Sequence, residues 1–170
     1  MSKAERTMPN AVITPDQDAV ICEVEIAAPP EKIFQALTSS DLLMRWWNGG
    51  DGPFRAKVWE FDPRIGGRVR QVAYDPSGQI TINGISELEI QGEVTELDPP
   101  RTLAYTWRAN FHSLPKHETL VRWELKPHAG GTQVKVTHSR LKPVAMAQGY
   151  ADGWPGVMGE LRKFAEGGRA

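Results

Sequence analysis

Histidine is the side chain best suited to proton transfer near neutral pH, and the chain has four. His138 shares one face of an alternating stretch with Val134 and Val136, which would turn its ring toward an apolar interior. There it could anchor a ligand or donate a proton, although a core histidine bonded to its neighbours is the favoured interpretation. His112 and His117 are five residues apart, which matches no common zinc spacing, and we expect both in a surface loop.

Other reactive residue types lack the partners that their chemistry requires. Cys22 is the only cysteine, so one chain can form neither a disulfide nor a cysteine zinc site, and we interpret it as a small core residue. Gly66-Gly67-Arg68 does not precede a helix and therefore fits a hairpin turn better than a phosphate-binding loop. A glycine-flanked serine elbow is missing from the sequence. We expect no catalytic residue set, no metal site and no cofactor.

Length and charge limit the class of protein. The 170 residues suit one domain, and the formal net charge of −1 argues against a general nucleic-acid binder, which normally carries a basic stripe. No segment approaches the roughly 18 consecutive apolar residues of a membrane span, and the N-terminus lacks the apolar core of a signal peptide. These patterns favour a cytoplasmic protein with neither a nucleic-acid nor a membrane partner.

The first elements are predicted from hydrophobic periodicity. Residues 1–18 mix proline and polar residues without a period, so we expect a flexible tail followed by a single domain over residues 19–168. Alternating apolar residues predict a first strand over residues 19–28, which Pro29-Pro30 ends. Two short helices should follow, one over residues 30–37 and one capped by Ser39 or Ser40.

The rest of the chain predicts six strands and a long helix. The expected strands cover residues 54–61, 68–74, 85–97 with a bend near Gly92, 102–109, 117–126 and 132–140. Apolar residues from Tyr150 to Phe164 then recur every three or four positions, which indicates an amphipathic helix that Pro155 could kink or begin. The order indicates an α+β domain, in which a curved antiparallel sheet of about seven strands wraps around the last helix.

A curved sheet closed by one helix tends to leave a pocket between the two, and aromatic residues fall where they would line it. The predicted ligand-binding residues are Trp46, Trp59, Phe61, Tyr105, Trp107, Trp123, His138, Tyr150, Trp154 and Met158. The alternative is that the same side chains fill the core and leave no cavity. Periodicity does not separate these two interpretations.

Several motifs, taken in order, resemble a known superfamily. They are residues 28–37, Trp46-Trp47, residues 61–68, residues 92–103, residues 131–138 and Gly153-Trp154. From about residue 20 to 166 the sequence is similar to the polyketide cyclase/START-related superfamily, abbreviated SRPBCC. Within it, the sequence resembles the branch homologous to the C-terminal domain of the activator of the heat-shock-protein-90 ATPase. The resemblance implies a helix-grip fold. The turn after Trp47 and the long segment 79–91 depart from the usual pattern, at the rim of the expected pocket.

The resemblance leaves three functions open, because relatives include ligand carriers, aromatic-ring cyclases and a co-chaperone. Our leading hypothesis is a binding protein for a hydrophobic, aromatic or polycyclic small molecule, held between the last helix and the sheet. The alternative is a cyclase or aromatase that uses the same cavity, with His138 as its acid–base residue. A co-chaperone-like stress-response role ranks last, because the chain lacks room for a second partner-binding domain. An exposed sheet edge could support a homodimer.

Overall fold

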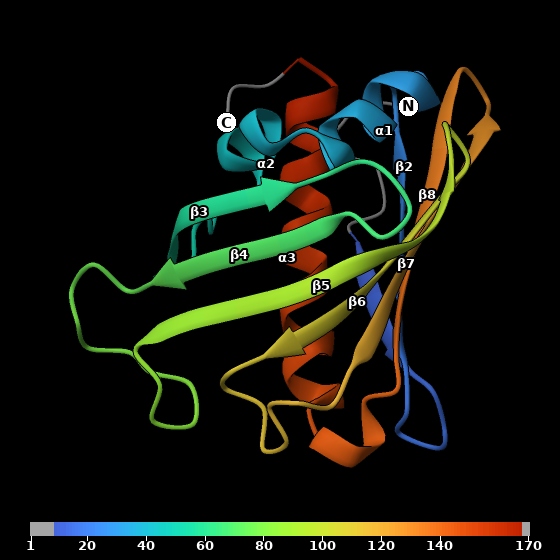
Figure 1. Ribbon diagram of the computed structural model, residues 1–170. Coiled ribbons are helices and arrows are strands. Elements are labelled where there is room, and N and C mark those ends of the chain that lie inside the picture. The colour runs from blue at the N-terminus through green and yellow to red at the C-terminus, as the bar shows by residue number, and fades with distance from the viewer. Residues whose placement is uncertain (1–8, 168–170) are drawn as a thin grey trace.

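An eight-stranded antiparallel sheet forms the body of the protein, in the order β1-β2-β8-β7-β6-β5-β4-β3 (Figure 1). The structure is a computed structural model that describes residues 9–167. Its strands are β1 (Asn10–Ile13), β2 (Val20–Ile26), β3 (Arg55–Phe61), β4 (Arg68–Tyr74), β5 (Glu87–Asp98), β6 (Thr102–Ala109), β7 (Thr119–His128) and β8 (Gly131–Ser139). Its helices are α1 (Pro30–Thr38), α2 (Ser40–Trp46), the 3-10 turn η2 (Lys142–Val144) and α3 (Ala147–Ala165).

The eighth strand corrects the prediction of a flexible tail over residues 1–18. Asn10–Ile13 forms β1 and pairs with β2, with Asn10 opposite Glu23 and Ile13 opposite Val20. Four residues are too few to show a convincing period, so the sequence pattern missed this strand. Residues 1–8 lie outside the described part of the chain. The six strands from β3 to β8 and the first strand, now β2, confirm the expected order.

Two short helices follow β2 as predicted, and local chemistry explains their ends. Pro30 is the first residue of α1, where its missing N–H costs nothing because that position makes no intrahelical bond. Ser39 separates the helices and caps α2, since its Oγ accepts a hydrogen bond from the Leu42 N–H at 3.3 Å. Both helices lie near the C-terminal end of α3 (Figure 1).

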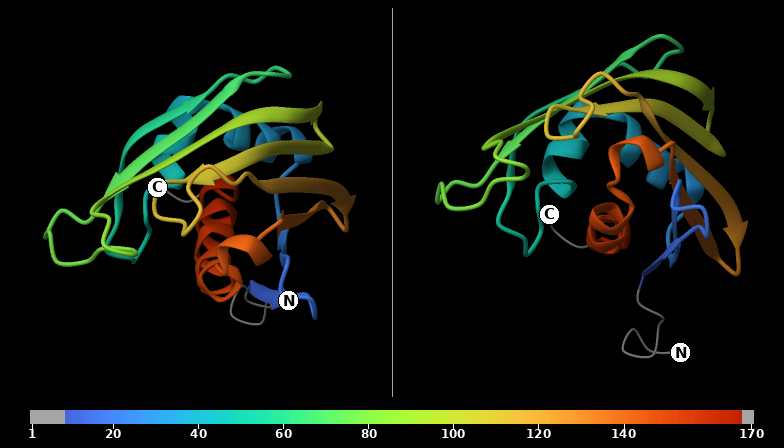
Figure 2. Two further views of the ribbon diagram at one scale, coloured as in Figure 1. Left: turned by 60° about the horizontal axis from the view of Figure 1, so that its bottom comes forward. Right: turned by 90° about the horizontal axis from the view of Figure 1, so that it is seen from below.

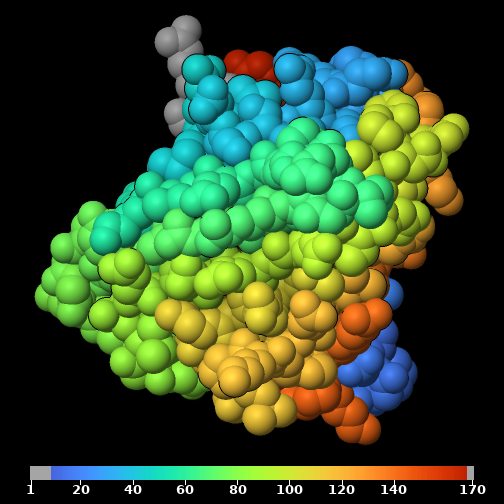
Figure 3. Space-filling view, viewed as in Figure 1, coloured from blue at the N-terminus to red at the C-terminus, as the bar shows by residue number. Residues whose placement is uncertain are grey.

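The sheet curves around α3. Seen from below, the strands form an arch with α3 under it (Figure 2). The space-filling view of the outer side shows the strands covering most of α3 (Figure 3). The predicted bend near Gly92 lies close to an irregularity, because the register of β5 on β6 shifts between Val94 and Glu96. Next to this shift, the Glu93 N–H donates to the Thr106 Oγ1 at 3.0 Å.

The long helix crosses the concave face of the sheet and completes the predicted α+β helix-grip architecture. Pro155 lies inside α3 and neither begins nor ends it. The helix buries Trp154, Met158 and Leu161 against the inner face of the sheet, in one continuous apolar core. Within residues 9–167, every helix is too short or too polar to cross a membrane.

Candidate ligand-binding site

All ten residues predicted to line a pocket lie together in the space between α3 and the concave face of the sheet. Nine are at most 7% exposed, and Tyr150 is half-buried. Their rings contact one another, as shown by Phe61 against Tyr105 at 5.7 Å and Trp107 against Trp154 at 6.3 Å between ring centroids. The tertiary structure therefore gathers one aromatic cluster from α2, α3 and four different strands.

Trp47 lies at the centre of this cluster, although it was missing from the predicted set. Its ring centroid lies within 4.9 to 6.3 Å of five other tryptophans, which are Trp46, Trp59, Trp107, Trp123 and Trp154. Trp47 caps the C-terminal end of α2 and leaves the helical conformation, with φ −99° and ψ 69°. Helical spacing consequently gives no guide to where this side chain points.

Trp47 also differs from the other five tryptophans in its hydrogen bonding. The indole N–H groups of those five donate to Ala36 O, Trp47 O, Tyr150 Oη, Tyr105 Oη and His138 Nδ1, at 2.9 to 3.2 Å. No described residue accepts a hydrogen bond from the Trp47 indole. Five rings are therefore held in fixed orientations, whereas the Trp47 ring is held by packing alone.

His138 is a bonded core histidine. The Trp154 indole donates to Nδ1 at 3.2 Å, so the ring proton is on Nε2, which lies 2.7 Å from Thr119 Oγ1. That hydroxyl donates in turn to the Trp107 carbonyl at 2.7 Å. Burial is the main reason that the pKa of His138 falls to about 3, so the ring is neutral at pH 7. Its two bonds connect α3 to β7 and leave no ring nitrogen for a substrate.

His112 corrects the prediction of a surface loop residue. It is 3% exposed, and its Nε2 lies 2.6 Å from the Tyr150 hydroxyl of α3. The same hydroxyl accepts the Trp107 indole N–H at 3.0 Å. Burial, with a smaller contribution from His117, lowers the pKa of His112 to about 4. The pattern gave no signal for this position, because Tyr150 lies 38 residues further along the chain.

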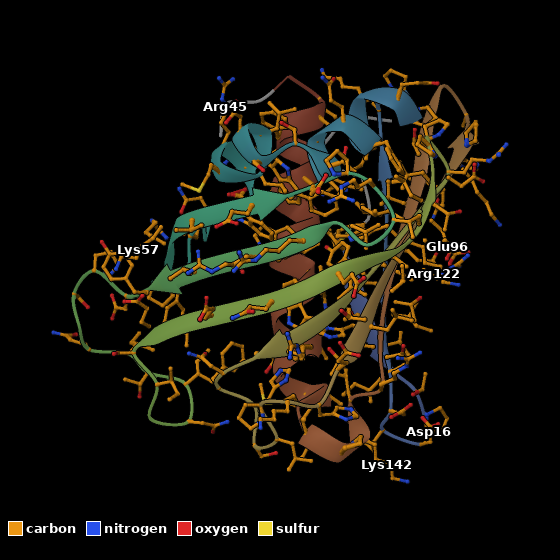
Figure 4. The ribbon with its side chains drawn as sticks, in the orientation of Figure 1. Asp16, Arg45, Lys57, Glu96, Arg122 and Lys142 are labelled. Carbon is orange, nitrogen blue, oxygen red and sulfur yellow. The ribbon has the colours of Figure 1, made fainter. Side chains whose placement is uncertain are left out.

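A groove leads from the surface to Trp47. It has a volume of about 510 Å³ and lies between the loop after α2 and the exposed side of α3. The residues that line it are Trp46, Trp47, Asn48, Gly49, Gly50, Asp51, Gly52, Gly153, Pro155, Gly156, Val157, Gly159, Glu160 and Arg162. A second recess of about 370 Å³ shares the same loop and includes Arg45 of α2, which points outward in Figure 4.

The outer face of the sheet has a different character. Arg122 pairs with Glu96 at 2.9 Å and with Glu124 at 3.0 Å, and Figure 4 shows the first of these pairs on the side of the sheet away from α3. Arg70 lies in the same way between Glu60 and Glu89. Alternating charges that satisfy one another are typical of a solvated sheet face. The aromatic side is therefore the candidate site.

Potential metal ligands and the single thiol can be assessed for residues 9–167. No three histidine, cysteine or acidic side chains are grouped there in a way that could hold a metal ion. Cys22 is buried, and burial raises the pKa of its thiol to about 11, so the thiol stays protonated.

Comparison with known proteins agrees with this architecture. The family described as activator of Hsp90 ATPase homolog 1-like protein matches residues 27–166. The chain belongs to this family. The SRPBCC resemblance inferred from the motifs is thereby confirmed, and the family match includes the aromatic cluster, the loop after α2 and all of α3. No curated protein matches the chain.

Solved structures show the same fold. A protein from Rhodobacter sphaeroides is 23% identical with a TM-score of 0.75, over 93% of this chain and 97% of that one. A protein from Mycobacterium smegmatis is 20% identical with a TM-score of 0.74, over 93% and 96%. A protein from Mesorhizobium loti is 26% identical with a TM-score of 0.64, over 85% and 94%. For this Hsp90-activator-like chain, these likenesses establish the helix-grip fold.

Proposed function

We propose that this protein binds a hydrophobic aromatic small molecule between α3 and the concave face of the sheet. The ligand enters through the groove and takes the place of the Trp47 indole. One observation carries the proposal: the Trp47 ring, which lines the groove, is also the centre of the aromatic cluster. A ligand that replaces this ring meets aromatic faces that already pack against an indole.

The surroundings of Trp47 favour its movement. Its indole would leave the cluster without breaking a hydrogen bond to a described residue. The loop that follows contains three glycines, and both Gly49 and Gly50 have positive φ angles, of 86° and 48°. Glycine tolerates the backbone changes that such a swing requires. The loop is tied back by the Asn48 side chain, which accepts the Ala56 N–H at 2.7 Å, and by the Gly52 carbonyl, which accepts from Arg55 Nη1 at 2.7 Å.

Binding is favoured over catalysis by the state of His138. A cyclase or aromatase would use this residue as its acid–base group, but both ring nitrogens already have partners and its pKa lies far below 7. We therefore assign His138 a role in holding the walls of the site. We also propose a cytoplasmic location, from the composition alone.

The proposal can be tested with 2-ethylnaphthalene, a two-ring probe without a hydrogen-bonding atom. The six indole N–H signals of the ¹⁵N-labelled protein are followed during a titration. We expect saturable binding, with the Trp47 signal shifting most. Trp47→Ala should bind about tenfold more tightly, because the ligand no longer competes with the indole. Gly156→Phe should weaken binding, because a side chain there would fill the groove.

Gln148→Phe is the matched control for the groove variant, because Gln148 is exposed on α3 and lies outside the groove. It should bind as the unmodified protein does. The proposal fails if the unmodified protein shows no saturable shift, or if Gly156→Phe binds as well as Gln148→Phe.

A further inference from the structure

Three hydrogen-bonding side chains meet near the N-terminal end of α3, and together they have one more donor hydrogen than they have acceptors for it. Trp107, Tyr150 and His112 contribute three polar hydrogens, one each from the indole, the phenol and the neutral imidazole. The Trp107 hydrogen goes to the Tyr150 oxygen, and the Tyr150 hydrogen then goes to His112 Nε2. The remaining hydrogen is on His112 Nδ1, which is buried and has no partner. Leaving a buried donor unpaired is costly, so the position calls for an acceptor.

The other tautomer leads to the same conclusion. If His112 carried its hydrogen on Nε2 and donated to Tyr150, the phenol hydrogen would have no acceptor and Nδ1 would remain unpaired as well. That arrangement leaves two unsatisfied atoms instead of one. Burial lowers the pKa of His112 and raises that of Tyr150, so both groups are neutral at pH 7 and the count of hydrogens holds.

The side chains of Trp107, Tyr150 and His112 adjoin the aromatic cluster. The Tyr150 ring lies 4.3 Å from the His138 ring, and His138 in turn contacts Trp107 and Trp154 at 5.8 Å each. Along α3, Tyr150 precedes the groove residues Gly153 to Arg162. A molecule of two fused rings held among the tryptophans would contact them with its apolar body while one end reaches the His112 donor.

We propose that His112, positioned by Tyr150, is the hydrogen-bonding anchor of the site, and that the ligand is an aromatic molecule with a carbonyl oxygen. This inference rests on the proposed function and adds the chemical class of the ligand. The His112 donor gives the bound molecule one orientation, with its oxygen toward β6 and the loop after it. A purely apolar ligand would leave that donor unpaired.

The test compares 2-acetylnaphthalene with 2-ethylnaphthalene, which have similar shape but differ in the carbonyl oxygen. The unmodified protein should bind the acetyl probe about three- to tenfold more tightly, the usual gain from one neutral hydrogen bond. His112→Phe should abolish this preference and leave the affinity for the ethyl probe nearly unchanged. His117→Phe, in the same loop, is the control and should keep the preference.

A second readout uses the unmodified protein alone and so does not depend on the folding of a variant. The ¹⁵N signals of the His112 imidazole should identify Nδ1 as the protonated nitrogen, and the acetyl probe should shift that signal. If neither probe binds, the proposed function fails. If both bind equally and the Nδ1 signal does not move, the site stands but the anchor is wrong, and a water molecule or a small rearrangement satisfies His112.

Discussion

At the scale of single residues, two buried histidines have opposite surroundings. His138 uses both ring nitrogens to hold Trp154 and Thr119, whereas His112 uses one and leaves the other unpaired. His138, which the strand pattern singled out, is structural, whereas His112, which was assigned to a surface loop, is buried against Tyr150 of α3. In this fold, the capacity to bind a polar ligand group belongs to side chains with unsatisfied hydrogen-bonding atoms, because the other polar atoms already have partners.

Both histidines predict a loss of stability in mild acid. Their folded pKa values, about 3 and about 4, lie below the ordinary value of 6.5. The unfolded chain therefore binds protons first, and stability present above pH 6.5 is lost as the pH falls toward 4. At pH 5 each histidine should cost about 2 kcal/mol of unfolding free energy relative to pH 7.5, measured by urea denaturation.

The matched variants separate this effect from other titrations. His112→Phe should reduce the change between pH 7.5 and pH 5 by about half. Phe111→Leu, at the neighbouring buried position, is the control and should leave the change intact, because it removes no titratable group. An unchanged unfolding free energy between pH 7.5 and pH 5 in the unmodified protein would contradict the buried, neutral state of both rings.

At the scale of elements, α3 is a weak helix that depends on its packing. It contains Gly149, Gly153, Gly156 and Gly159 as well as Pro155. Each interior glycine costs about 1 kcal/mol and the proline about 3 kcal/mol relative to alanine. The buried side chains on the opposite face supply the stability that the helix lacks by itself. Three of these glycines and the proline line the groove, so the residues with the lowest helix propensity lie on the open side of α3.

Alanine substitutions at two glycines should therefore act in opposite directions. A Cβ at Gly156 would meet nothing within 4 Å, and Gly156→Ala should stabilise the protein by about 1 kcal/mol. A Cβ at Gly92 would lie 1.7 Å from the Thr106 carbonyl oxygen, so Gly92→Ala should cost about 1–3 kcal/mol through displaced backbone. Urea denaturation measures both, and equal signs would refute the account of these two positions.

At the scale of the whole molecule, the short strand β1 is one of the two edge strands of the sheet and covers the edge of β2. Its Ala11 and Ile13 are half-buried and pack against the core, while Val12 is 58% exposed. Without β1, the backbone edge of β2 would be free to pair with another chain. The first strand thus contributes packing to the core and protection to the edge.

Deletion of residues 2–13 should lower the unfolding free energy by about 2 kcal/mol, because the half-buried side chains are lost. It should also produce concentration-dependent dimers, measured by light scattering after size-exclusion chromatography. Val12→Ser is the control and should change stability by less than about 0.5 kcal/mol, since its side chain faces solvent. A truncated protein that is monomeric and equally stable would show that β1 is dispensable.

Local pattern determined most of the architecture. Alternation from Val20 to Ile26 predicts β2, and the three- and four-residue spacing from Tyr150 to Phe164 predicts α3, because these periods are set by strand and helix geometry within each segment. The same patterns placed ten side chains in one interior cluster. Whether a ligand enters that cluster stays a prediction.

Only the tertiary structure decided three further features. The pairing of Asn10–Ile13 depends on the free edge of β2, and the burial of His112 depends on Tyr150 from the distant helix α3. The inward turn of Trp47 depends on where α2 ends relative to five other tryptophans. Each arises from contacts between segments far apart in the chain. Periodicity within one segment carries no information about such contacts.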